Sequence, residues 1–232
     1  MTYPLIIFLL SPLLLVQGIY VRLTTPRLPE PIGERDGVIG NGSTLRLLIL
    51  GDSAAAGVGV AHQNEALAGQ LIEPLSTNFH LTWQLLAKNG DRCKDLIAIL
   101  EQQSKPFDVV LISIGVNDVT GGLSLDSWHS QLMKVIALVR TKFSARQIIF
   151  TALPPMHLFP ALPQPLRWVF GFRAKQFNRI LQSIIANQAH CHFLTITTPL
   201  QVDYIAEDGF HPNAKTYAIW ANQAAQVIKQ AR

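Results

Sequence analysis

The chain has 232 residues, a length that suits one domain, with 49% hydrophobic and only 15% charged residues. This balance predicts a well-filled core and argues against a disordered chain. The net charge of +4 is mild and no Lys/Arg run marks a nucleic-acid-binding arm, so we expect no nucleic-acid partner. Cys93 and Cys191 lack the spacing of a metal or redox site. We interpret them as separate thiols, with a disulfide as the alternative.

The N-terminus differs in kind, because residues 1–21 carry no charged side chain. We predict that they form a hydrophobic anchor, or a signal segment, and that the protein associates with a membrane. Whether the segment is cleaved stays open. We favour the periplasmic side of a bacterial inner membrane. The alternative is a cytoplasm-facing domain, which the positive-inside rule alone would give, because Arg22 and Arg27 follow the segment.

Residues 22–43 are rich in Pro, Gly and charge, and predict a linker to a domain that spans residues 44–232. Within the domain, short apolar runs predict strands, and apolar residues at helical spacing predict helices between them. The strands are expected at 45–50, 81–87, 107–115, 147–152 and 192–196, and the helices near 67–75, 96–100, 128–143, 177–184 and 212–228.

This alternation predicts an α/β fold with a parallel sheet and helices on both faces. In such sheets, ligands bind at the carboxyl ends of the strands. Three short polar segments fall at predicted strand ends, namely Gly51-Asp52-Ser53, Asn89-Gly90 and Gly115-Val116-Asn117-Asp118.

Ser53 is a candidate nucleophile at the end of the first strand. The G-x-S-x-G motif is not matched, because residue 55 is Ala. By itself, the serine is more typical of a cap on the following helix than of a nucleophile. A serine nucleophile needs a base, because its free hydroxyl is almost fully protonated at neutral pH.

His211 is the histidine whose surroundings suit a base. It follows Asp208 by three residues, and Pro212 favours the start of a helix directly after it. The ring would then lie in a loop at the sheet edge, where Asp208 could accept from the imidazole and stabilise its charged form. The alternative is a turn with a chance histidine.

Candidate donors for an oxyanion follow the strands as well. The side-chain amide of Asn117 can donate to an oxyanion, although Asn after a strand is often only a turn former. Gly90 lets a backbone N–H approach a ligand closely. The N–H of Ser53, at a helix N-terminus, would be a third donor.

Together these segments resemble the SGNH, or GDSL-type, hydrolase family. The four blocks of that family match Gly51-Asp52-Ser53, Asn89-Gly90, Gly115-Val116-Asn117-Asp118 and Asp208-Gly209-Phe210-His211, in family order. The chain departs from the family pattern at Ala54, where Leu is common, and at Asp91-Arg92-Cys93, where the family often has Ser and Thr.

The resemblance implies a flavodoxin-like three-layer α/β/α fold with a doubly wound parallel five-stranded sheet. It implies serine ester hydrolysis without a metal or other cofactor. It also implies a Ser53-His211-Asp208 triad and an oxyanion hole formed by Ser53, Gly90 and Asn117.

Residues 153–172 follow the fourth strand and contain five prolines, which argue against a regular helix. Their apolar side chains predict a wall for an acyl chain, or a membrane-facing patch, and packing onto the domain is the alternative. We assign substrate binding to Trp168, Phe170 and Phe172. The same apolar surface includes Met156, Leu158 and Phe159.

The sequence therefore predicts a serine hydrolase that cleaves carboxylic or lipid-like esters, with lysophospholipids and acyl thioesters among the possible substrates. One alternative is an acyltransferase or deacetylase that acts on a glycan with the same triad. A second is a non-catalytic binding module, which the presence of all three triad residues disfavours. The oligomeric state is not predicted.

Overall fold

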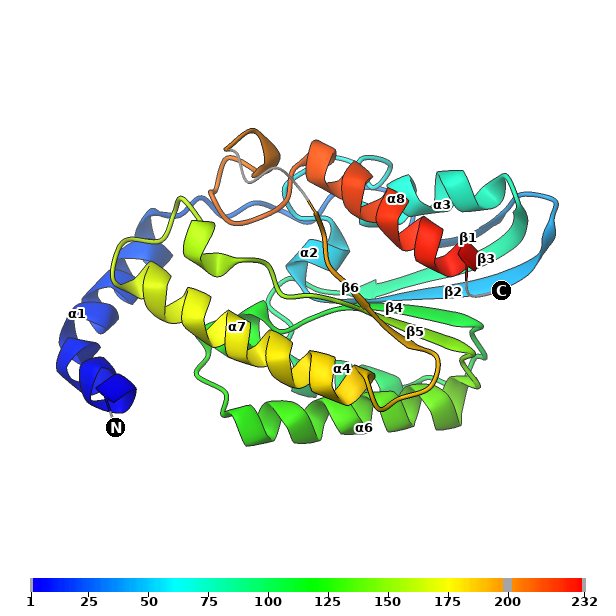
Figure 1. Cartoon of the computed structure of the whole chain (residues 1–232). Helices are drawn as coiled ribbons and strands as arrows, with labels where there is room; N and C mark the ends of the chain where they lie inside the picture. Colours follow the sequence, from blue (N-terminus) through cyan, green and yellow to red (C-terminus); the bar gives the residue numbers. More distant parts are fainter. Residues whose placement is uncertain (1, 198–201, 231–232) are drawn as a thin grey trace.

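A computed structural model describes residues 2–197 and 202–230 of the chain. The fold has three layers, with a central sheet between two layers of helices (Figure 1). It is the α/β architecture with a mostly parallel sheet that the sequence predicts.

The sheet contains the five predicted strands as neighbours in the order β3-β2-β4-β5-β6, all parallel. This is the strand order 2-1-3-4-5 of the flavodoxin-like fold, in which the winding of the chain reverses between the first and the third parallel strand. That reversal lies between β2 and β4. The strands are β2 (Ser43–Gly51), β3 (Phe79–Ala87), β4 (Val109–Ser113), β5 (Gln147–Thr151) and β6 (Cys191–Leu194).

A sixth strand, β1 (Asp36–Ile39), pairs antiparallel with β3 at the sheet edge. It lies inside the segment that we expected to be only a linker, so the described sheet has six strands rather than five. Sequence patterning misses this strand because it has four residues and turns no side chain into the core. Val38 and Ile39 are exposed.

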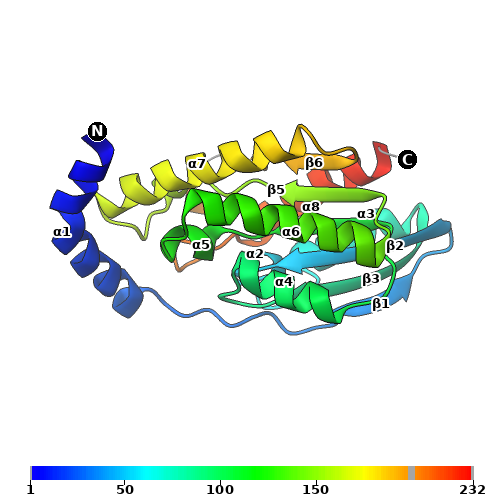
Figure 2. The ribbon, with the colours of Figure 1, turned by 90° about the horizontal axis from the view of Figure 1, so that it is seen from below.

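Helices cover both faces of the sheet (Figures 1 and 2). Alternate side chains of the parallel strands enter the two cores, so that Leu48 packs on one side and Leu47 on the other. One face carries α3 (Leu67–Ser76) and α8 (Ala214–Gln230); the other carries α4 (Cys93–Gln102), α6 (Leu125–Phe143) and α7 (Leu166–Ile185).

Helix α7 begins earlier than predicted. All five prolines of residues 153–172 precede Leu166, and the last of them, Pro165, is the N-cap of the helix. The prolines therefore confine the irregular part to the segment before Leu166, and residues 166–172 are helical.

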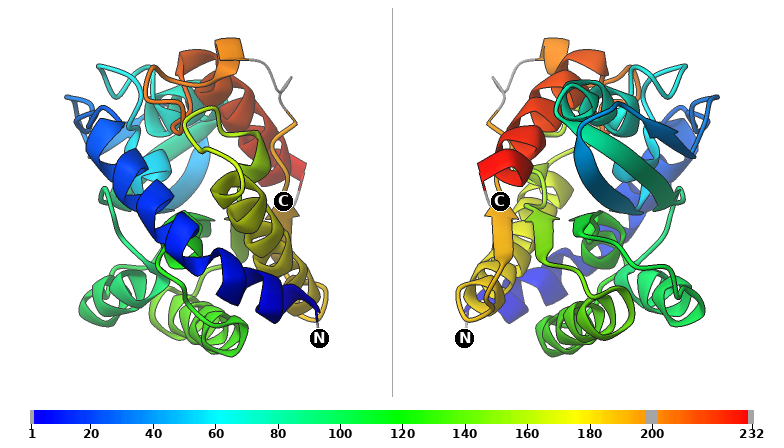
Figure 3. Two further views of the ribbon diagram at one scale, coloured as in Figure 1. Left: turned by 90° about the vertical axis from the view of Figure 1, so that its left-hand side faces the viewer. Right: turned by 90° about the vertical axis from the view of Figure 1, so that its right-hand side faces the viewer.

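The N-terminal residues form one long helix, α1 (Thr2–Thr24), which lies outside the layered domain (Figure 3). Its segment Leu5–Thr24 is long and apolar enough to cross a membrane, and none of it is buried. The helix contacts the start of α7. The Gln17 amide donates to the carbonyl of Gln164 (2.6 Å) and accepts from the N–H of Leu166 (3.1 Å).

Candidate active site

Ser53 lies where β2 ends and the short helix α2 (Ser53–Ala56) begins. The strand must end in glycine, because a Cβ on Gly51 would lie 2.1 Å from the carbonyl oxygen of Ser113 on β4. This close approach brings the ends of β2 and β4 together at the point where the sheet reverses its winding.

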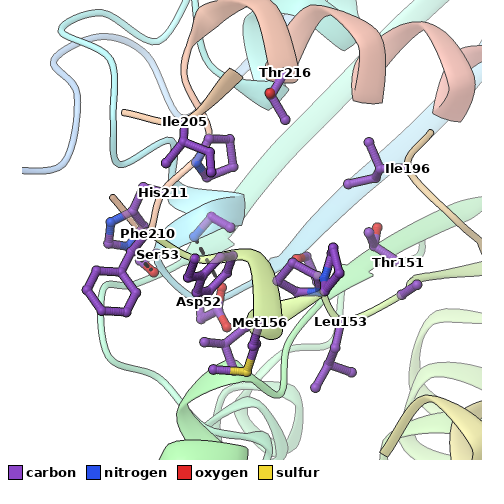
Figure 4. A pocket seen from close by; sticks show the side chains of 18 of the residues that line it. Asp52, Ser53, Thr151, Leu153, Met156, Ile196, Ile205, Phe210, His211 and Thr216 are labelled. Carbon is purple, nitrogen blue, oxygen red and sulfur yellow. Dashed lines mark hydrogen bonds between the residues drawn. The ribbon is translucent and has the colours of Figure 1, made fainter. Parts of the chain in front are cut away.

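Three of the predicted site residues form one hydrogen-bonded chain. Nε2 of His211 lies 2.8 Å from Oγ of Ser53, although the two residues are 158 positions apart. Nδ1 of His211 contacts Oδ2 of Asp208. Figure 4 shows Ser53 and His211 close together at one end of a pocket.

The loop before α8 holds this arrangement. Oδ1 of Asp208 accepts the backbone N–H groups of Phe210 (2.9 Å) and His211 (3.0 Å). The second carboxylate oxygen is therefore left to accept Nδ1–H of His211, which makes Nε2 the acceptor for the Ser53 hydroxyl.

The Asp208 carboxylate is stabilised where it lies. Burial raises its pKa, but the hydrogen bonds from the His211 side chain and from the N–H groups of His211 and Phe210 outweigh burial and hold the pKa below its ordinary value. Asp208 is thus an ionised acceptor at neutral pH.

Gly90 occupies the turn that follows β3. The turn is closed by a hydrogen bond from the N–H of Asp91 to the carbonyl of Lys88 (3.2 Å). Gly90 is its third residue and has φ +91°, a value that a type II turn requires at this place and that glycine adopts without strain. Gly90 itself does not line the pocket, whereas its neighbour Asn89 does.

Asn117, in the short helix α5 (Val116–Thr120) after β4, reaches the same turn. Its Nδ2 donates to the carbonyl of Asp91 (2.9 Å) and it lines the pocket beside Ser53. The next residue, Asp118, accepts the N–H of Cys93 (3.1 Å). The structure therefore ties the polar segments after β3 and β4 together.

The pocket beside Ser53 has a volume of about 320 Å³ and a largely apolar wall. Its apolar residues come from the segments that follow β4, β5 and β6 and from the loop that carries His211 (Figure 4). They include Ile114, Leu153, Met156, Leu158, Phe159, Ile196, Ile205 and Phe210.

Trp168, Phe170 and Phe172 do not line this pocket. They lie on α7, where Trp168 stacks on Phe172 at 6.3 Å between ring centroids, and Phe170 packs against the core. The helix that begins at Leu166 carries them away from the strand ends. Met156, Leu158 and Phe159, which belong to the same predicted apolar surface, do line the pocket.

One polar pair in the pocket wall was not found from sequence. Thr151, at the end of β5, accepts a hydrogen bond from Nε1–H of Trp220 on α8 (3.1 Å), and both residues line the pocket. No motif marks them, because the pair joins residues 69 positions apart. Within the described residues, no cluster of His, Cys, Asp and Glu suits a metal ion, and both cysteines are free thiols.

Asp52 is a buried acid beside the nucleophile. Its side chain accepts from the N–H of Ala54 (3.1 Å), and only 2% of the residue is exposed. Burial, with some repulsion from Asp118, raises its pKa to about 7, against the opposing hydrogen bond and the attraction of His211. The native state therefore holds this proton more tightly than the unfolded chain does.

The change that Asp52→Asn makes in the free energy of unfolding should be more favourable at pH 8 than near pH 4, by roughly 2–4 kcal/mol. A raised native pKa means that the contribution of Asp52 to stability is complete below the unfolded pKa and falls as the pH rises toward 7. Urea unfolding across this range measures the difference. Exposed Asp36→Asn is the control, and a pH-independent difference for Asp52→Asn would contradict the expectation.

Comparison with known proteins identifies relatives of this arrangement. Residues 49–219, well over half of the chain, match the model of the GDSL-like lipase/acylhydrolase family. A search of curated proteins finds no match.

Among solved structures, a lipolytic G-D-S-L protein from Veillonella parvula is 18% identical with a TM-score of 0.64, covering 80% of this chain and 98% of its own. A psychrotrophic esterase from Pseudoalteromonas sp. is 20% identical (TM-score 0.60, covering 80% and 97%). An acetylxylan esterase from Geobacillus stearothermophilus is also 20% identical (TM-score 0.56, covering 81% and 95%). At these identities the structures support the fold. On the match across residues 49–219, the chain belongs to the GDSL-like lipase/acylhydrolase family.

Proposed function

We propose that this protein hydrolyses carboxylic esters with medium-length, lipid-like acyl chains, with Ser53 as the nucleophile. The observation that carries the proposal is the Asp208–His211–Ser53 hydrogen-bonded chain at one end of an apolar pocket. A hydroxyl, an oriented imidazole and a carboxylate are the groups that acyl transfer to serine requires.

In the proposed reaction, Oγ of Ser53 attacks the ester carbonyl carbon while its proton passes to Nε2 of His211. Asp208 holds the imidazole in orientation and stabilises the imidazolium. The imidazolium then gives its proton to the leaving alcohol, and an acyl-Ser53 intermediate remains. Water adds to this intermediate with His211 as the base, and release of the carboxylic acid restores the free serine hydroxyl.

The N–H groups of Ser53 and Gly90 and the side-chain amide of Asn117 are the proposed donors to the oxyanion. The hydrogen bond from Asn117 to the carbonyl of Asp91 supports this role, because it holds the amide beside the turn that carries Gly90. A planar amide has two N–H bonds, so one remains for the oxyanion.

The apolar wall favours an acyl chain over a sugar as the group bound next to Ser53, because sugars need polar lining. Helix α1 supports a membrane location, since its outward side chains, such as Phe8, Leu9 and Leu15, are exposed. It contacts the start of α7, directly after the segment that lines the pocket. A substrate ester that comes from the bilayer would suit both the apolar pocket wall and the exposed apolar helix α1.

We expect kcat/KM to rise from acetyl to octanoyl p-nitrophenyl esters, by up to about fourfold per methylene, because each methylene gains about 0.8 kcal/mol on full burial. Leu158→Ala should reduce this rise and leave acetyl ester cleavage within about twofold. Leu158 lines the pocket and is 38% exposed, so its loss should leave the fold intact.

Trp168→Ala is the matched control, because Trp168 is 42% exposed and lies outside the pocket wall. The measurement is kcat/KM across the ester series for the wild type, Leu158→Ala and Trp168→Ala. A profile that is flat in the wild type, or an equal response to both substitutions, would contradict the acyl-chain assignment. Transfer of the acyl group to a sugar in preference to water would favour the glycan acyltransferase alternative.

A further inference from the structure

The chain between the N-terminal helix and the sheet is bound to the domain at two places, the loop after α2 and strand β3. We call residues 30–39 the strap. Near its start, the N–H of Ile32 donates to the carbonyl of Ala61 (3.1 Å), and the carbonyl of Ile32 accepts from the N–H of Gln63 (2.9 Å), in the loop after α2. At its end, β1 pairs with β3. In Figure 2 this segment runs from α1 to the edge of the sheet.

Glu30 uses both oxygens of its carboxylate in this strap. Oε1 accepts the backbone N–H of Asn89 at 2.6 Å, and Oε2 accepts from Nη1 of Arg35 at 2.8 Å. Arg35 in turn donates through Nη2 to the carbonyl of Ala87, the last residue of β3. Both side chains are only about one-third exposed, at 30% for Glu30 and 34% for Arg35.

These contacts bracket the turn that carries Gly90. Arg35 holds the carbonyl at the end of β3, and Glu30 holds the N–H of the residue directly before Gly90. Asn117 holds the carbonyl of Asp91 on the other side. A backbone N–H donates a stronger hydrogen bond to a carboxylate than to a neutral acceptor, so Glu30 firmly restrains the Lys88-Asn89 peptide, which directly precedes the peptide that carries the Gly90 N–H.

The ion pair with Arg35 also neutralises the negative charge of Glu30. An unpaired carboxylate near the forming oxyanion would repel it, whereas the Glu30–Arg35 pair is close to neutral as a whole. The turn is thus fixed by an anion whose charge is already balanced.

From this geometry we propose that Glu30 is a positioning residue for the oxyanion hole, because it orients the turn whose Gly90 N–H stabilises the transition state. The inference rests on the proposed ester hydrolysis and adds a residue outside the four family blocks. It also places a residue that supports catalysis only a few residues after α1 ends at Thr24.

The test compares Glu30→Ala, Glu30→Gln and Glu34→Ala in the full-length protein with p-nitrophenyl octanoate. Loss of a whole oxyanion donor lowers kcat by roughly 10²- to 10³-fold, so a displaced donor in Glu30→Ala should lower kcat by about 10-fold or more. KM should stay within about twofold, because the acyl pocket is untouched. Glu30→Gln keeps an acceptor for the N–H of Asn89 and should recover most of kcat.

Glu34→Ala is the control, because it removes the same charge from an exposed position of the strap and should retain wild-type kcat. Thermal melting checks the fold of each variant. If Glu30→Ala does not fold, Glu30→Asp takes its place, since the shorter side chain keeps the charge but not the reach, and kcat should again fall at unchanged KM.

A folded Glu30→Ala with wild-type kcat, or a loss in kcat matched by Glu34→Ala, would overturn the role of Glu30. Wild type and Ser53→Ala are measured beside these variants. Hydrolysis that does not depend on Ser53, or no hydrolysis by the wild type, would overturn the proposed function and this inference with it. A wild-type-like Glu30→Ala beside an inactive Ser53→Ala would overturn the inference alone.

Discussion

Ser53→Ala is expected to lower kcat for ester hydrolysis by roughly 10⁴- to 10⁶-fold and to leave KM and the melting temperature close to wild type. The substitution removes one hydroxyl, whose observed contact is with Nε2 of His211 at 2.8 Å. The apolar pocket that binds the substrate stays intact. Steady-state kinetics on one activated ester measure the loss directly.

The same experiment identifies the reacting atom. An organophosphonate should form a single covalent adduct on Ser53 in the wild type and none in Ser53→Ala, as located by mass spectrometry of peptides. Ser113→Ala is the matched control, because Ser113 is a second serine that lines the same pocket. A Ser113→Ala variant should keep both activity and labelling, and an adduct on any serine other than Ser53 would disprove the assignment.

The parts of the fold that could be predicted are those whose signal is local. The central parallel strands β2, β4 and β5 turn side chains into both cores, so they appear as continuous apolar runs, such as the one that ends at Gly51. The polar residues that follow β2 and β4 are then confined to one edge of the sheet by topology. Ser53 and Asn117 could therefore be assigned to one site from the sequence, and both line the same pocket.

The parts that could not be predicted depend on pairings across the chain. Glu30 lies in a Pro-rich stretch that looks like a linker, and its bond to the N–H of Asn89 joins residues 59 positions apart. Strand β1 has no buried side chain pattern to mark it.

The sequence indicated that the segment after β5 would line the acyl-binding pocket, but not which of its residues would do so. The sequence identified a dense apolar segment after β5, but not the residue at which it becomes helical. Of residues 153–172, those that line the pocket lie between Leu153 and Phe159, whereas the residues from Leu166 onward lie on α7 and do not line it. The N-cap position of Pro165 was a usable signal, since proline favours the beginning of a helix.

Asp208→Asn is expected to lower kcat by roughly 10³- to 10⁴-fold with little change in KM, although the substitution is nearly isosteric. The Asn oxygen can still accept the N–H groups of Phe210 and His211, so the loop should keep its conformation. The other group becomes an NH2 that donates to Nδ1 of His211. The imidazole must then carry its proton on Nε2, where it donates to Ser53 instead of accepting from it.

Stability should change in a pH-dependent way in the same variant. Because the native pKa of Asp208 is below its ordinary value, the carboxylate stabilises the wild type above the unfolded pKa, and this contribution is lost as the pH falls through the native pKa. Asp208→Asn should therefore be less stable than the wild type at pH 7, and the difference should shrink in acid. Chemical unfolding at several pH values measures this difference, and kcat and KM are measured on the same proteins.

Asp203→Asn, at an exposed position of the preceding segment, serves as the control and should match the wild type in both stability and kinetics. Wild-type kcat in Asp208→Asn would mean that another group orients His211, and the triad assignment would then have to be abandoned.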